Sequence, residues 1–126
     1  GERKAVKSIP EIKVEDYGPK NFIIDGELKK EDKEEVQRGF SRAKEALKED
    51  WDILILDEIN VALYFEALEL VEVLDYIEKA NDKNELVFTG RNAPKEIIEK
   101  ADLVTETKAI KHPYNKGFNP RKGIEY

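Results

Sequence analysis

The strongest constraint on the fold is a short apolar run, Ile53–Leu56 (ILIL), enclosed by Asp52 and Asp57. Four apolar residues in a row are too few for a helix and show no polar alternation, so they predict a strand that is buried on both faces. Strands of this kind occur inside parallel sheets. Two further apolar runs predict similar strands, over Leu86–Phe88 and over Leu103–Thr107.

Helical periodicity separates these strands along the chain. Apolar residues recur every three or four positions over residues 32–48 and 69–79, which predicts two amphipathic helices. Pro94 suits the first turn of a third helix, which carries Ile97, Ile98 and Ala101. This alternation predicts an α/β fold with a mostly parallel sheet and helices on both faces. We expect residues 1–126 to form a single domain.

Composition excludes several functional classes. The chain contains no cysteine and a single histidine, His112, which excludes disulfides, a thiolate nucleophile and a multi-histidine metal site. A formal net charge of -6 argues against non-specific binding of nucleic acid. The sequence contains neither an apolar run of about 18 residues nor a signal-peptide pattern. We therefore expect a cytoplasmic protein that binds neither nucleic acid nor a membrane.

Polar residues follow the predicted strands, at the carboxyl ends where parallel sheets bind their ligands. The candidate segments are Asp57-Glu58-Ile59-Asn60, Thr89-Gly90-Arg91-Asn92 and Thr105-Glu106. An acidic pair after a buried strand is the Walker B arrangement, in which rigid carboxylates organise Mg²⁺ on a nucleotide. Alternatively, the acidic pair only caps the next helix. Arg91 likewise has two interpretations, because it could face a phosphate or pair with a surface carboxylate.

Four segments carry a resemblance to a known family. They read WDILILDEINVAL (Trp51–Leu63), LVFTGRNAP (Leu86–Pro94), ADLVTETKAIKHPYNKG (Ala101–Gly117) and KGIEY (Lys122–Tyr126). Their order and spacing resemble the P-loop family of ATP:corrinoid adenosyltransferases. The resemblance implies a P-loop NTPase fold of the RecA-like type and a cytoplasmic homodimer. Its members use ATP and Mg²⁺ to place a 5′-deoxyadenosyl group on the cobalt of a reduced corrinoid, which forms adenosylcobalamin and releases triphosphate.

The resemblance also implies roles for individual residues. Asp57 and Glu58 would be the carboxylates that organise Mg²⁺, and with Arg91 they would form the catalytic group. Asn60 and Thr89 would contact the bound substrates. Reduced cobalt is itself a strong nucleophile, so the protein must orient ATP, stabilise the departing triphosphate and exclude water.

Aromatic residues of the family press against the corrinoid, and the corresponding stretch here is Tyr17-Gly18-Pro19-Lys20-Asn21-Phe22. The expected corrinoid contacts are therefore Phe22 or Tyr17. The spacing of these aromatic residues from Gly18 differs from the family pattern.

The family's phosphate-binding loop, Gly-x-x-x-x-Gly-Lys-Ser/Thr, does not occur in the 126 residues. In the family fold its strand lies inside the sheet, so its absence would leave strand edges unpaired. We therefore expect the chain to be the carboxyl-terminal part of a longer nucleotide-binding domain. The alternative is a shortened relative that binds a corrinoid or a partner protein without catalysing transfer. A different P-loop ATPase would need the same acidic pair but not the carboxyl-terminal segments.

Overall fold

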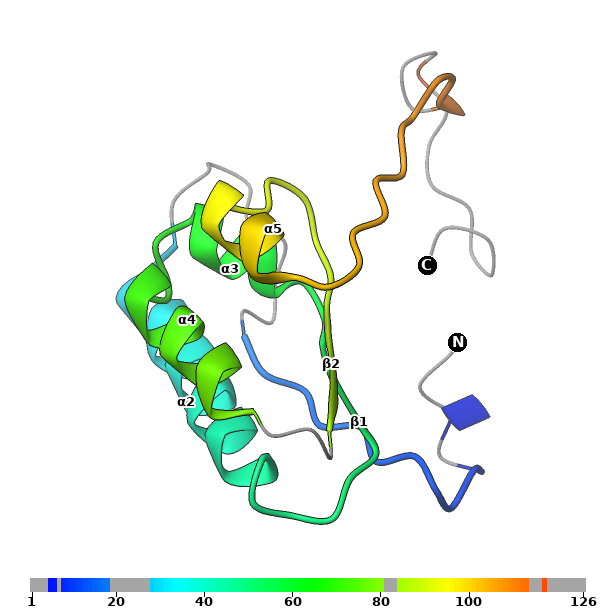
Figure 1. The fold of residues 1–126 in the computed structure, drawn as a ribbon. Helices are drawn as coiled ribbons and strands as arrows, with labels where there is room; N and C mark the ends of the chain where they lie inside the picture. The colour runs from blue at the N-terminus through cyan, green and yellow to red at the C-terminus, as the bar shows by residue number, and fades with distance from the viewer. Residues whose placement is uncertain (1–4, 7, 19–27, 81–83, 114–116, 118–126) are drawn as a thin grey trace. The chain divides into compact units, whose positions relative to one another are not determined.

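The computed structural model describes residues 5–6, 8–18, 28–80, 84–113 and 117 (Figure 1). The chain divides into two compact units, one made of residues 1–15 and 103–126 and the other of residues 16–102. The second unit contains the elements that position the site. In chain order they are α2 (Lys30–Ala46), β1 (Ile53–Leu56), α3 (Ile59–Tyr64), α4 (Leu70–Lys79), β2 (Glu85–Phe88) and α5 (Lys95–Lys100).

Strands β1 and β2 form a parallel pair, with Ile53 opposite Glu85 and Leu56 opposite Phe88. The first two predicted strands and their parallel arrangement are therefore confirmed, as is the α/β class. Burial alternates along both strands, because the even-numbered residues face the core while Ile55 is 64% exposed. The prediction that these strands are buried on both faces is wrong for the described chain.

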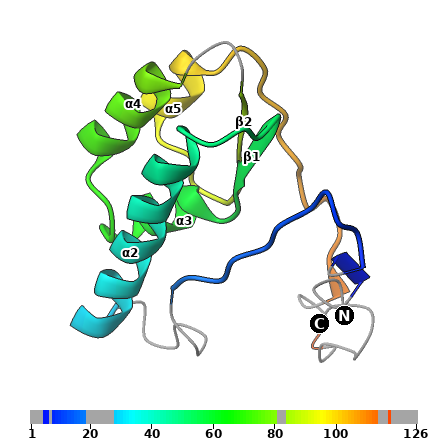
Figure 2. The same ribbon diagram turned by 90° about the horizontal axis from the view of Figure 1, so that it is seen from below.

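The helices explain this one-sided burial. Both views show α2 and α4 on the same side of the two strands (Figures 1 and 2). Leu56 and Phe88 pack against the core on that side, whereas Ile53 and Ile55 point away from it and are exposed. The described residues thus supply one helical layer, and the expected helices on the second face are not among them. No described helix is long and apolar enough to cross a membrane.

Helix α2 confirms the predicted amphipathic helix, with bounds two residues earlier than expected. The Asp32 carboxylate accepts the backbone N–H of Lys29 at 3.2 Å and so satisfies one donor at the start of the helix. Gly39 lies within this helix, where glycine costs about 1 kcal/mol relative to alanine. A Cβ atom at Gly39 would lie 2.6 Å from Cβ of Tyr17, so the close approach of Tyr17 requires glycine there.

The core centres on Val73 and Tyr76 of α4, which are 0% and 1% exposed. The Tyr76 ring lies 5.4 Å from the Phe40 ring of α2 and 6.4 Å from the Phe88 ring of β2, measured between centroids. Such aromatic pairs add to the stabilisation from buried apolar area. Ile97 of α5 completes the same cluster. Helices α4 and α5 confirm the second and third predicted helices.

Two elements differ from the sequence-based expectation. Helix α3 was not predicted, because its six residues, INVALY, carry no amphipathic period. It nevertheless buries Ile59 and Leu63 in the core. The strand predicted over Leu103–Thr107 is wrong, since this segment is irregular and Leu103 is 85% exposed. A strand requires a hydrogen-bonded neighbour, and no strand in the described part of the chain pairs with this segment.

Tyr76 makes stability depend on pH. Burial raises the pKa of the Tyr76 hydroxyl from 10.0 to about 12. Below pH 10 both the folded and the unfolded state hold this proton, so the group adds no pH dependence. Above pH 10 the unfolded state releases the proton first, and by pH 11 the free energy of unfolding should fall by about 1.4 kcal/mol because of this group.

Tyr76→Phe is expected to abolish this loss. The variant also removes a buried hydroxyl that has no hydrogen-bond partner among the described residues, so at pH 7 it should be at least as stable as the wild type, by up to about 1 kcal/mol. Urea denaturation at pH 7, 9 and 11 gives the free energy of unfolding of both proteins. Lysines that titrate in this range are the same in both, so their contribution cancels in the difference between variant and wild type. An equal loss of stability in both proteins would contradict this assignment.

Candidate functional site

The parallel pairing of β1 and β2 brings two of the three candidate segments together. The Thr89 N–H donates to the Leu56 carbonyl at 3.3 Å, which extends the strand pairing by one residue. Asp57 and Glu58 follow Leu56 directly, so they lie beside Thr89 at the carboxyl ends of the strands. The third candidate segment, Thr105-Glu106, follows no strand in the described part of the chain.

The Thr89 hydroxyl joins both acidic residues. It donates to Oδ1 of Asp57 at 2.6 Å and accepts the backbone N–H of Glu58 at 2.9 Å. A threonine hydroxyl has one proton to donate, and here that proton is given to Asp57. Thr89 therefore fixes one oxygen of the Asp57 carboxylate and the backbone of Glu58 at the same time.

Glu58 turns the chain sharply from β1 into α3. Its backbone is left-handed, with φ 59° and ψ 21°, a conformation that is uncommon for residues other than glycine. The Glu58 carbonyl accepts the N–H groups of Val61 and Ala62 at 3.0 and 3.1 Å, which begins the helix. The Asn60 N–H instead donates to the Thr89 carbonyl at 3.2 Å. Thr89 thus accepts the N–H of Glu58 with its hydroxyl and the N–H of Asn60 with its carbonyl, and so holds the turn at two points.

The Glu58 side chain does not cap helix α3. Glu58 is the N-cap residue, yet its carboxylate makes no capping hydrogen bond. Asp57 directs one oxygen to Thr89 and not to the first turn of the helix. The alternative that this acidic pair only caps the following helix therefore lacks the hydrogen bond that it requires.

Gly90 allows the two segments to approach closely. Its φ is +116°, and a Cβ atom at this position would lie 3.1 Å from Oε2 of Glu58 and 3.2 Å from Cα of Glu58. A larger residue would be strained by its backbone conformation and would also press on the Glu58 carboxylate. Gly90 thus leaves room for the Glu58 carboxylate beside the loop that follows β2.

Asn60 carries a buried acceptor at this site. The residue is 6% exposed, and its Nδ2 group donates to the Gly90 carbonyl at a long 3.4 Å. The Asn60 Oδ1 atom has no hydrogen-bond partner in the described part of the chain. Buried acceptors are normally satisfied, so this oxygen is an exception that a donor outside the described residues would satisfy.

The other predicted site residues lie in different surroundings. Arg91 is exposed in the same loop as Thr89. Tyr17 packs against α2, where the Arg38 guanidinium lies 5.3 Å from its ring centroid. Phe22 falls outside the described residues. The structure therefore brings together Asp57, Glu58, Asn60 and Thr89, with Arg91 two residues after Thr89 in the same loop.

The donor set fits a magnesium ion that is shared with a substrate. The residues described by the structure include no group of three or more acidic or histidine side chains that could enclose a metal ion. Mg²⁺ does not require such a group, because it commonly binds through one or two carboxylates and keeps water and phosphate oxygens as its other ligands. Asp57 and Glu58 could supply those carboxylates.

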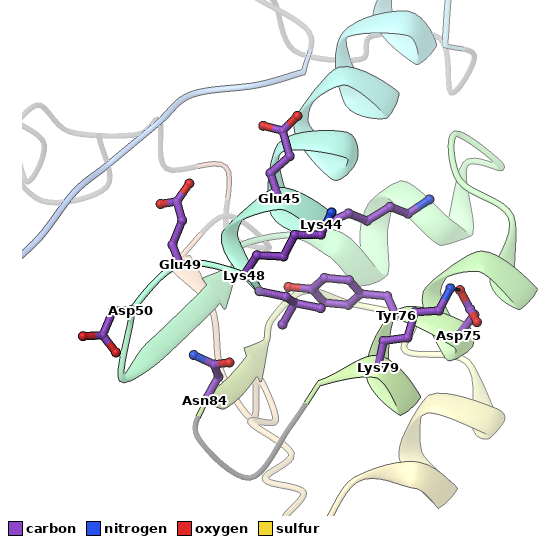
Figure 3. A pocket seen from close by; sticks show the side chains of 10 residues that line it. Lys44, Glu45, Lys48, Glu49, Asp50, Asp75, Tyr76, Lys79 and Asn84 are labelled. Carbon is purple, nitrogen blue, oxygen red and sulfur yellow. Dashed lines mark hydrogen bonds and ion pairs between the residues drawn. The ribbon is translucent and has the colours of Figure 1, made fainter.

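A cavity that the sequence did not predict lies at the opposite ends of the strands. It has a volume of about 630 Å³, and Figure 3 shows its lining side chains. Asp50 and Asn84 precede β1 and β2, and the buried Tyr76 ring forms part of the wall. The cationic and acidic side chains here partly neutralise each other, as in the Lys79–Asp75 ion pair. None of the predicted site residues lines this cavity.

Comparison with known proteins supports the resemblance seen in the sequence. The family model described as ATP:corrinoid adenosyltransferase BtuR/CobO/CobP matches residues 1–126. A corrinoid adenosyltransferase of Sinorhizobium sp is 37% identical over 93 residues, which is 72% of this chain and 44% of that protein. One of Pseudomonas aeruginosa is 37% identical over 98 residues, 71% of this chain and 48% of that protein.

A corrinoid adenosyltransferase of Escherichia coli is 27% identical over 106 residues, which is 83% of this chain and 54% of that protein. The chain thus spans about half the length of the curated relatives that it matches. The family model nevertheless matches every residue of it, including the loops that hold Asp57 and Thr89. The chain belongs to the ATP:corrinoid adenosyltransferase BtuR/CobO/CobP family.

Proposed function

We propose that the intact protein transfers the 5′-deoxyadenosyl group of ATP to the cobalt of a reduced corrinoid. The observation that carries this proposal is the family match over residues 1–126. The acidic pair held at the carboxyl ends of β1 and β2 supports it, because this is where open α/β sheets bind their ligands. The activity is proposed for the intact protein, since the chain spans about half of its relatives' length.

The proposed reaction is a nucleophilic displacement at C5′ of ATP. The reduced cobalt supplies the electron pair of the new cobalt–carbon bond. The C5′–O bond breaks, and its electron pair leaves with the triphosphate. The protein therefore needs no nucleophile of its own, which suits a chain without cysteine. Its tasks are to align the reactants, to stabilise charge on the leaving group and to exclude water.

The residues of the site can divide these tasks. Bound Mg²⁺ would neutralise charge on the departing triphosphate. Asp57 and Glu58 would hold that ion through their carboxylates. Arg91 is an exposed residue of the loop that contains Thr89, and its guanidinium would pair with phosphate oxygens. Asn60 would accept a hydrogen bond from the substrate through its buried Oδ1 atom.

The proposed corrinoid contacts are Tyr17 and Phe22, as the resemblance implies. Tyr17 is 39% exposed although its side chain packs against Gly39 and Arg38 of α2. A ring held in this way keeps an accessible surface for a flat, largely apolar ligand. Support for Phe22 comes from the sequence alone.

We further propose that residues 1–126 form a single α/β domain of the P-loop NTPase type, and that the protein is a cytoplasmic homodimer. The two-stranded parallel sheet and the family match support the fold. Support for the homodimer comes from the resemblance. Light scattering on the intact protein tests it, since a dimer has twice the chain mass and a monomer would contradict the proposal.

The transfer activity is tested directly with ATP, Mg²⁺ and a chemically reduced corrinoid. The intact protein is expected to form a light-sensitive adenosyl–cobalt product, which has a visible spectrum distinct from that of the substrate, and to release triphosphate in equal amount. Corrinoid binding without product, in the presence of ample reductant, would contradict the proposal and favour a relative that binds without catalysing transfer.

Glu58→Gln is expected to lower kcat about 100-fold while the protein remains folded, because the change keeps the shape of the side chain and removes its charge. Glu85→Gln is a matched control. Glu85 is an exposed glutamate at the other end of β2, so the same chemical change there should leave kcat unaltered. Equal turnover in wild type and Glu58→Gln would remove Glu58 from the site.

A further inference from the structure

We propose that Thr89 is a positioning residue, whose hydroxyl sets the geometry of the Asp57–Glu58 pair and does not itself contact ATP. The effect on catalysis rests on the proposed function, but the geometric role does not. This inference differs from the expectation that the resemblance gave, in which Thr89 contacts a substrate. It follows from the hydrogen bonds of one side chain.

The bonding capacity of the hydroxyl is largely used within the protein. Its one proton is donated to Oδ1 of Asp57 at 2.6 Å, and one lone pair accepts the Glu58 N–H at 2.9 Å. Donation to a phosphate oxygen would require Thr89 to give up its bond to Asp57. The short bond to a carboxylate is of the stronger, charge-assisted kind, so exchanging it for a substrate contact brings little gain.

The position of Thr89 is fixed by backbone hydrogen bonds on two sides. Its N–H donates to the Leu56 carbonyl at 3.3 Å, at the end of β1. Its carbonyl accepts the Asn60 N–H at 3.2 Å, at the beginning of α3. The side chain therefore starts from a backbone that is held between the strand before the acidic pair and the helix after it. Such a residue can transmit the strand register to the Asp57 carboxylate and to the Glu58 backbone.

The Glu58 turn shows what the hydroxyl maintains. Glu58 adopts a left-handed backbone that an ordinary residue seldom takes unless its surroundings impose it. The Thr89 hydroxyl satisfies the N–H of that residue, and Gly90 leaves room for its carboxylate. Without the hydroxyl, the Glu58 N–H and Oδ1 of Asp57 both lose a partner. The turn could then relax, and the two carboxylates would no longer share one fixed arrangement.

The geometric part of the proposal is tested by amide hydrogen exchange in the intact protein. Thr89→Val keeps the branched shape and deletes the hydroxyl, whereas Thr89→Ser keeps the hydroxyl. Exchange of the Glu58 amide is expected to be at least about tenfold faster in Thr89→Val and within about twofold of wild type in Thr89→Ser. Unchanged protection in Thr89→Val would overturn the proposal. Thr89→Ala deletes the same hydroxyl and replaces Thr89→Val if the latter fails to fold.

The catalytic part is tested by steady-state kinetics of adenosyl transfer. Loss of positioning should lower kcat about 100-fold, leave KM for ATP within about threefold, and raise the Mg²⁺ concentration needed for half-maximal rate. Thr89→Ser should restore kcat to within about threefold of wild type. A raised KM for ATP with unchanged kcat would overturn the proposal, because it would indicate direct substrate contact.

The two parts of the test separate this proposal from the proposed function. If the wild-type protein forms no adenosyl–cobalt product, the proposed function fails. The Glu58 amide measurement still decides whether Thr89 holds the turn, since it requires neither ATP nor a corrinoid.

Discussion

The four-residue parallel pairing of β1 with β2 determines where the chemistry of this protein can lie. It places Leu56 opposite Phe88, so residues that are 32 positions apart in the sequence become neighbours at the carboxyl ends of the strands. A shift of one residue would turn every strand side chain to the other face and would separate Thr89 from Asp57. The core therefore fixes the site indirectly, because the half-buried leucines and phenylalanine that pack under α2 and α4 set this register.

Helix α3 links the core to the site over only six residues. Isolated helices of this length are unstable in water, so tertiary contacts must hold α3 in place. Its Ile59 and Leu63 side chains are buried in the core, while its first turn is bonded to Thr89 through the Asn60 N–H. The left-handed Glu58 is thus held between a packed helix and a paired strand. This arrangement explains how a backbone conformation that is unfavourable by itself persists at the site.

The sequence predicted those features that depend on local pattern. Strands β1 and β2 and helices α2, α4 and α5 follow from runs and periods that can be read in the chain itself. Three other features depend on which elements lie nearby, and local pattern cannot supply that information. They are the exposure of Ile55, the short helix α3, and the lack of strand pairing at Leu103 in the described part of the chain. The general rule for parallel sheets directed attention to the residues after each strand. Sequence alone did not indicate the bond from the Thr89 hydroxyl to Asp57 or the packing of Tyr17 on α2, because both depend on how side chains from distant segments are oriented.

The division of roles within the site follows from the chemistry proposed for it. A reaction whose nucleophile is the substrate's own cobalt gains most from fixed positions and fixed charges, since mobile groups would have to be ordered during the reaction. The described residues suit that requirement, because the Thr89 hydroxyl holds one oxygen of the Asp57 carboxylate and the backbone N–H of Glu58. Arg91 adds an exposed positive charge in the loop that follows β2. A positioned acidic residue for a metal ion and a nearby cation together match the charge that the proposed reaction develops on its leaving group.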